Sequence, residues 1–167
     1  MAEKDTTYNS KMKFDGIFNF KEFYKFCYNW LTEEESMELK EKKYSEQISG
    51  NSKNIDIEWN CMKRFTDYFR FDAIITFKII GLSNVEINQD GQKINTNKGK
   101  IEISVKGVLV RDYEGKFETT ASLKFMRAIY EKWIITTRVE EFEDEILKSC
   151  QDFLDQAKAY LDLEAKK

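Results

Sequence analysis

The chain has 167 residues, is 41% apolar and 14% aromatic, and carries a net charge of −3. This composition is globular, of one-domain size, and gives no general attraction to nucleic acid or anionic membranes. The absence of histidine excludes Ser-His-Asp and Cys-His nucleophiles and histidine-ligated zinc. Three distant cysteines without CxxC spacing favour a reducing, cytoplasmic compartment. No apolar run approaches the roughly 20 residues of a membrane-spanning helix.

The stretch FNFKEFYKFCYNWL predicts the first helix. Asn19 and Glu22 have capping-box spacing, and Phe18 with Phe23 fits a hydrophobic staple. Apolar residues then recur on one helical face. We therefore expect a helix from residue 20 to about 34.

A weaker pattern follows over residues 37–49. Its apolar parity changes part-way, which favours an edge strand with a bulge, protected by Lys40, Lys42 and Lys43. The polar stretch SGNSKN then predicts a turn.

Residues 54–80 carry an apolar row on the odd positions, interrupted by Lys63 and Asp67. One strand of that length would extend roughly 85 Å, and strands usually run 3–10 residues. The row must therefore break where the charges lie, either as a corner or as one helical turn. The predicted elements are a strand at 55–60, the corner at 61–67 and a second strand at 68–81.

Further antiparallel strands are predicted up to about residue 111. Asp90-Gly91 fits a type I′ hairpin turn, and NKGK (97–100) predicts the next turn. Alternating apolar residues over 101–109 predict a long strand, in which Gly107 marks a bulge or bend.

Beyond residue 121 the apolar period becomes 3.6, with no glycine or proline to the end. A single helix would extend roughly 60 Å, longer than a domain of this size is wide. The β-branched stretch 134–139 is the expected weak place. The region is one continuous or two separate long helices.

These elements predict an α+β fold. Its order is an N-terminal helix, an antiparallel meander of five or six strands, and one or two long C-terminal helices packed on one face. We expect a mobile tail over residues 1–12 and a single globular domain over 13–167. This order of elements resembles the helix-grip arrangement of START-like binders, which implies a lipid or small-molecule cavity between sheet and helices.

Two groups of side chains are candidate sites. The charged corner could hold an anion beside an acid/base carboxylate, but a solvated corner with surface ion pairs is the favoured explanation, because such pairs are common on protein surfaces. The crowded aromatic residues could line a hydrophobic ligand site or simply bury the first helix on more than one side. The corner comprises Lys63, Arg64, Asp67 and Arg70, and the aromatic candidates are Phe23, Phe26, Trp30, Trp59 and Phe69.

The sequence does not point to an enzyme, a metal or a cofactor. In the acidic run over 140–145, the apolar residues interspersed with the acids fall on the buried face of the expected helix. The acidic side chains therefore lie on its solvated face and do not indicate a metal site. We expect a non-enzymatic protein-interaction or assembly module. Its long C-terminal apolar stripe would contact a protein partner or a second copy, and binding of a hydrophobic small molecule or lipid is the alternative.

Overall fold

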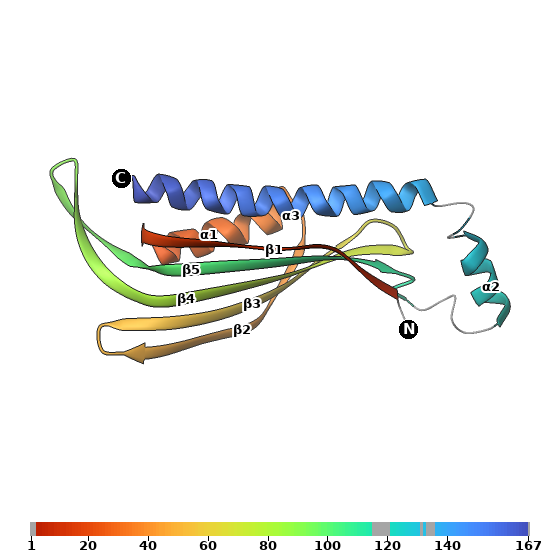
Figure 1. The fold of residues 1–167 in the computed structure, drawn as a ribbon, viewed down its shortest axis with the longest axis horizontal. Helices are drawn as coiled ribbons and strands as arrows, with labels where there is room; N and C mark the ends of the chain where they lie inside the picture. The colour runs from red at the N-terminus through yellow and green to blue at the C-terminus, as the bar shows by residue number, and fades with distance from the viewer. Residues whose placement is uncertain (1–2, 115–120, 131, 133–135, 167) are drawn as a thin grey trace.

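The computed structural model describes residues 3–114, 121–130, 132 and 136–166. Five antiparallel strands form one sheet in the order β1-β5-β4-β3-β2, and α1 and α3 cover one of its faces (Figure 1). The α+β class and the long C-terminal helix are thereby confirmed. The elements are β1 (Glu3–Phe18), α1 (Phe20–Asn29), the π-helical turn η1 (Trp30–Glu34), β2 (Glu38–Ser49), β3 (Ser52–Arg64), β4 (Phe69–Gln89), β5 (Gln92–Arg111), α2 (Ala121–Ile129) and α3 (Thr136–Ala165).

The described part of the chain starts with a strand, not with a helix. β1 pairs with β5 from Glu3 opposite Arg111 to Phe18 opposite Asn97, which corrects the expected N-terminal helix, and residues 3–12 of the expected tail lie in this strand. β1 is an edge strand whose inward residues are mostly half-buried, including Met12, except for Phe18 at its end, which is fully buried. Polar and apolar residues alternate over Lys11–Phe14, as in a half-buried strand, but not over Glu3–Thr7.

The local signals around α1 are confirmed. The Asn19 side chain accepts a hydrogen bond from the backbone amide of Glu22 at 3.0 Å, and the Phe18 and Phe23 rings meet edge to face with centroids 6.1 Å apart. β2 is the expected edge strand, and its register shifts at Glu41.

The long apolar row breaks as predicted. β3 ends at Arg64, residues 65–68 form a bend, and β4 begins at Phe69. The Thr66 hydroxyl holds this bend by accepting hydrogen bonds from the amides of Tyr68 and Phe69, at 3.1 and 3.0 Å. Both flanking strands are longer than predicted.

β4 and β5 form one very long hairpin. Asp90 and Gly91 have φ values of 53° and 79°, as a type I′ turn requires. The turn predicted at 97–100 is wrong, because these residues lie inside β5. A bulge at Gly81, with φ of 64°, bends β4, while Gly99 passes so close to β4 that an added Cβ would lie 3.1 Å from the Leu82 Cα.

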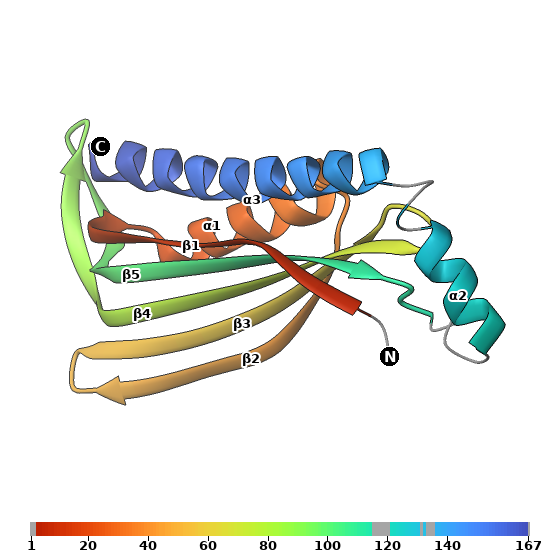
Figure 2. The ribbon, with the colours of Figure 1, turned by 45° about the vertical axis from the view of Figure 1, so that its right-hand side comes forward.

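α3 lies along the sheet (Figures 1 and 2). Its 30 residues extend about 45 Å, and the long strands supply enough sheet to cover its apolar stripe. Gly107 in β5 brings the helix close. The buried residues of α3 are Val139, Phe142, Ile146, Cys150, Phe153, Leu154, Ala157 and Leu161.

The C-terminal region forms two helices. α2 ends at Ile129 and α3 begins at Thr136, inside the predicted weak stretch, whose residues 134–135 lie outside the described part of the chain. None of the described helices combines the length and the apolar character needed to cross a membrane.

Candidate binding face

The face of the sheet that carries no helix, termed the open face, contains a trough of about 840 Å³. Strand alternation identifies the residues of its floor, because a residue next to a core position in a strand has its side chain on the opposite, helix-free face of the sheet. One cross-strand row places Lys40 opposite Asn60, Asn60 opposite Ile74, and Ile74 opposite Lys106. Lys40 and Lys106 are therefore three strands apart, roughly 14 Å between backbones.

Bulges shape the two sides of the trough. The register of β1 shifts between Thr6 and Tyr8, and that of β2 between Glu41 and Lys43. Thr6 and Lys42 both line the trough. Because a bulge bends its strand and increases the local twist, these shifts curve both edge strands at the level of the trough.

The trough is basic although the chain is acidic. Five cationic side chains line it against two acidic ones. One of the acids, Asp72, is held by Arg70 in a bidentate ion pair at 2.7 and 2.9 Å, so its charge is already compensated. The cationic lining residues are Lys4, Lys40, Lys42, Arg64 and Lys106, and the acidic ones are Glu38 and Asp72.

An unsatisfied acceptor lies beneath the floor of the trough. The Asn60 side-chain oxygen is buried and has no hydrogen-bond partner within the described part of the chain. A buried polar atom without a partner is costly. Because the oxygen is buried, this cost falls on the folded chain, and the oxygen gives no contact to a ligand in the trough.

The predicted charged corner is divided between the two faces. Lys63 pairs with Glu145 of α3 at 3.9 Å, on the helix side. Arg64 lies on the open face with its guanidinium 5.9 Å from the Tyr113 ring centroid, and Arg70 lies 5.4 Å from the same centroid. Asp67 is exposed in the bend. Strand alternation thus separates residues that are adjacent in the sequence.

The five aromatic candidates lie between sheet and helices, where they pack against other rings. Trp59 meets Phe77 with centroids 4.8 Å apart, and Phe26 stacks on Tyr160 at 4.6 Å. A nearby cavity between α3 and the sheet, bordered by Phe71 and Phe153, has only about 10 Å³. Ligand binding by Phe23, Phe26, Trp30, Trp59 and Phe69 stays a prediction, and these contacts account for their burial without a ligand.

A cluster that sequence reasoning missed joins α1 to β2. The Glu41 carboxylate accepts hydrogen bonds from the Tyr24 hydroxyl and, at 3.1 Å, from the Trp59 indole. Burial and the hydrogen bond to Glu41 raise the pKa of Tyr24 far above its ordinary value. The residues come from three distant segments, so only the register of β2 across its bulge could have brought them together.

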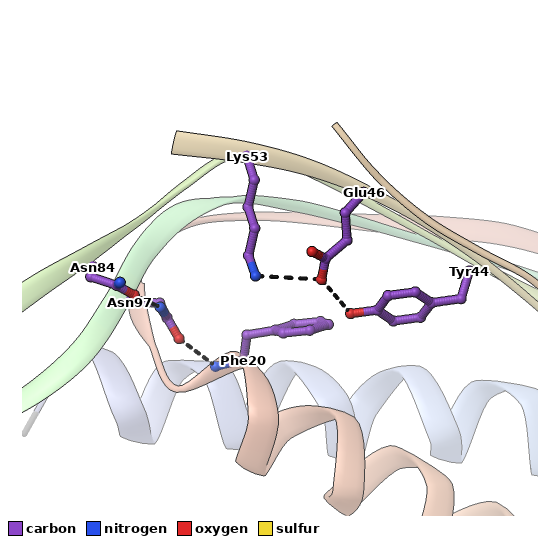
Figure 3. Close-up of polar contacts among 6 residues, drawn as sticks. All are labelled: Phe20, Tyr44, Glu46, Lys53, Asn84 and Asn97. Atoms are coloured by element: carbon purple, nitrogen blue, oxygen red, sulfur yellow. Dashed lines mark hydrogen bonds and ion pairs between the residues drawn. The ribbon is translucent and has the colours of Figure 1, made fainter. Parts of the chain in front are cut away.

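Figure 3 shows the adjacent contacts near the β2–β3 turn. The Tyr44 hydroxyl donates to Glu46 at 2.8 Å, and Lys53 lies 3.4 Å from the same carboxylate. Burial, followed by the bond to Glu46, raises the pKa of Tyr44 to about 12. On the other side the Asn97 oxygen accepts from the Phe20 amide at 3.1 Å. The Phe20–Asn97 bond ties the start of α1 to β5, and the other two contacts lie within the β2–β3 hairpin.

The described residues assemble little that suits catalysis. Burial raises the pKa of the Cys61 and Cys150 thiols to about 12, so neither is a thiolate at neutral pH. No group of three potential metal ligands occurs within the described ranges. Comparisons with protein-family models, curated proteins and solved structures found no match.

Proposed function

We propose that this protein is a non-enzymatic interaction module that binds an acidic, extended segment of a partner protein in the open-face trough. The observation that carries the proposal is the basic lining of the trough, with five cations against two acids, in a chain of net charge −3. Complementary charge of this kind steers and orients a partner more than it adds affinity.

The cross-strand row suits an extended polypeptide. Carboxylates at positions i and i+4 of an extended chain lie about 14 Å apart on one side, which matches the spacing of Lys40 and Lys106 estimated above. Met62, Ile74 and Val108 supply apolar surface beneath.

Nucleic acid fits this trough less well. Binding of single strands relies on aromatic side chains as stacking platforms, and no aromatic residue of the described chain lines the trough. Contact through the C-terminal helix stays a prediction. The large apolar side chains recorded as exposed on α3 are Leu147 and Leu163, which is little surface for a partner.

A labelled peptide in which glutamates recur at every fourth position tests the proposal by fluorescence anisotropy. Lys40→Glu/Lys106→Glu should weaken binding by about 1–2 kcal/mol, roughly tenfold in Kd, because two exposed attractions become repulsions. The matched control is Lys21→Glu/Lys25→Glu on α1, where both lysines are exposed and the change in net charge is the same.

Three further results would count against the proposal. Equal binding by the two double variants would show that the trough is not the site. Equal binding of a peptide with adjacent glutamates would remove the spacing argument. Tighter binding of a single-stranded oligonucleotide of equal charge would assign the trough to nucleic acid.

A further inference from the structure

α2 buries a charged residue and leaves large apolar side chains exposed, although Leu123, one turn before the buried residue, is half-buried on the inward side. Its buried residue is Arg127, whereas Phe125, Met126 and Ile129 are 67%, 57% and 39% exposed. A surface helix of a globular protein normally turns its apolar side to the core. The outer side of α2 therefore presents apolar surface that no described residue of the chain covers.

An ionic anchor sets the direction that α2 faces. The Arg127 guanidinium lies 3.1 Å from Glu3 and 3.7 Å from Asp112, and its Nε donates to the Tyr68 hydroxyl at 3.1 Å. Asp112 is only 2% exposed, so its charge requires this partner. Residues two positions before and after Arg127 lie roughly 160° around the helix from it. Phe125 and Ile129 therefore point away from the body.

The position of α2 makes this side accessible. Both views place the helix at one end of the molecule, beyond the end of α3 (Figures 1 and 2). A flat surface approaching this end would meet α2 before it met the sheet or α3. Phe125, Met126 and Ile129 are termed the apolar tip.

We propose that the apolar tip inserts into the interface of an anionic lipid surface. Fully exposed side chains of this size present roughly 200 Å² each, so the tip offers roughly 300 Å². A stable protein interface buries about 800 Å² on each partner, which argues against a second copy or a protein. Lipid insertion has no such threshold, because its strength grows with the inserted apolar area and with charge attraction.

The charges beside the tip complement anionic headgroups. Lys124 is exposed on α2, and lysines near a lipid surface are attracted to phosphatidylserine. The acidic groups on the body side, Glu3 and Asp112, already face Arg127. This inference is independent of the open-face trough and adds a second binding surface.

Flotation with phosphatidylcholine vesicles, with and without phosphatidylserine, tests the inference on the full chain. The wild type should float with the serine-containing vesicles. Phe125→Ser/Ile129→Ser should lower the bound fraction roughly tenfold, because two inserted side chains are lost. The matched control is Leu163→Ser, since Leu163 is 64% exposed on α3 and lies outside the tip. Lys124→Glu should reduce binding only to the anionic vesicles.

Absence of wild-type flotation, or equal flotation of Phe125→Ser/Ile129→Ser, would overturn the inference. The same holds if Leu163→Ser loses binding to the same extent. Light scattering that detects a dimer dissolved by Phe125→Ser/Ile129→Ser would assign the tip to a second copy instead. Circular dichroism confirms that each variant is folded, and peptide binding at the trough should be unchanged in all of them.

Discussion

Gly107 should be the glycine of the sheet least tolerant of a side chain. It lies in β5 beneath α3, and an added Cβ would be 2.8 Å from both the Cys150 Sγ and the Ile146 Cγ2, and 3.3 Å from the Tyr8 Cβ. Non-bonded carbon atoms prefer about 3.5–4.0 Å. Gly107→Ala must therefore push α3 outward or force its side chains out of their preferred rotamers.

The cost follows from that overlap. Adding a methyl group to a well-packed core typically costs about 1–3 kcal/mol. Here the added Cβ overlaps with two side-chain atoms, and both belong to α3. We expect the free energy of unfolding to fall by about 2 kcal/mol, which lowers Tm by roughly 4–8 °C in a chain of this size. Urea unfolding followed by tryptophan fluorescence and far-ultraviolet circular dichroism measures the loss.

A double-mutant cycle separates the clash from other effects. Cys150→Ala removes one of the two clashing atoms, so Gly107→Ala should cost less in that background, with a coupling of at least about 0.5 kcal/mol. Gly16→Ala is the matched control in β1, because its added Cβ meets only the Phe14 ring, at 3.1 Å, and that ring can move. Equal costs at the two glycines, or no coupling, would refute the close approach of α3.

Three further predictions concern the contacts around α1. Asn19→Ala should cost about 1 kcal/mol in thermal unfolding, since the cap of α1 is lost, whereas Asn19→Ser should retain most of it. Glu41→Ala leaves the Trp59 indole without its acceptor; a loss of about 1 kcal/mol and altered tryptophan emission are expected, and unchanged emission would contradict this bond. The folded-state pKa of Tyr44 is about 12, against 10.0 for the free side chain. The stability that the protonated Tyr44 side chain adds to the fold is therefore fully present below pH 10 and is lost as the pH rises toward 12. Absorbance titration of tyrosinate in the wild type and Tyr44→Phe measures this pKa, and ionisation of Tyr44 near pH 10 would contradict the bond to Glu46.

The features that the sequence predicted well are those fixed by a few neighbouring residues. The N-cap at Asn19 and the Asp90-Gly91 turn depend on a local hydrogen bond and on positive φ values, which can be predicted from residue type. The break between β3 and β4 was predicted from a usual strand length that the observed strands exceed, since β4 has 21 residues; locally the break is held by the Thr66 hydroxyl. The cap and the turn are determined by residue types at a few adjacent positions, so they can be predicted without knowledge of distant contacts.

The features that the sequence missed depend on distant pairing. β1 pairs with β5 along its whole length, whereas its own polar alternation covers only a few residues around Met12, too few to indicate a strand of this length. Gly99 resembled a turn residue, yet it lies within β5, where β4 passes close by at the Gly81 bulge. A glycine required by close approach of another backbone cannot be told from a turn glycine by its neighbours alone.

The trough was hidden for a related reason. Lys63 and Arg64 are adjacent in the chain, but β3 continues to Arg64, so successive side chains face opposite sides of the sheet. The bulge in β2 likewise decides which lysines of that strand share a face with Asn60. A one-residue change in register would exchange the two faces, and no local pattern determines that register.

The same alternation explains how an acidic chain can present a basic face. Acidic side chains collect on the exposed side of α3, including Glu140, Glu141 and Asp144, while the helix-free side of the sheet carries Lys40 and Lys106 in one row. A net charge near zero therefore conceals a separation of charge across the sheet. An acidic segment would be repelled by α3 and attracted to the trough, so its association rate should fall as salt shortens the screening distance. An association rate that does not change with salt would show that this separation plays no part in recognition.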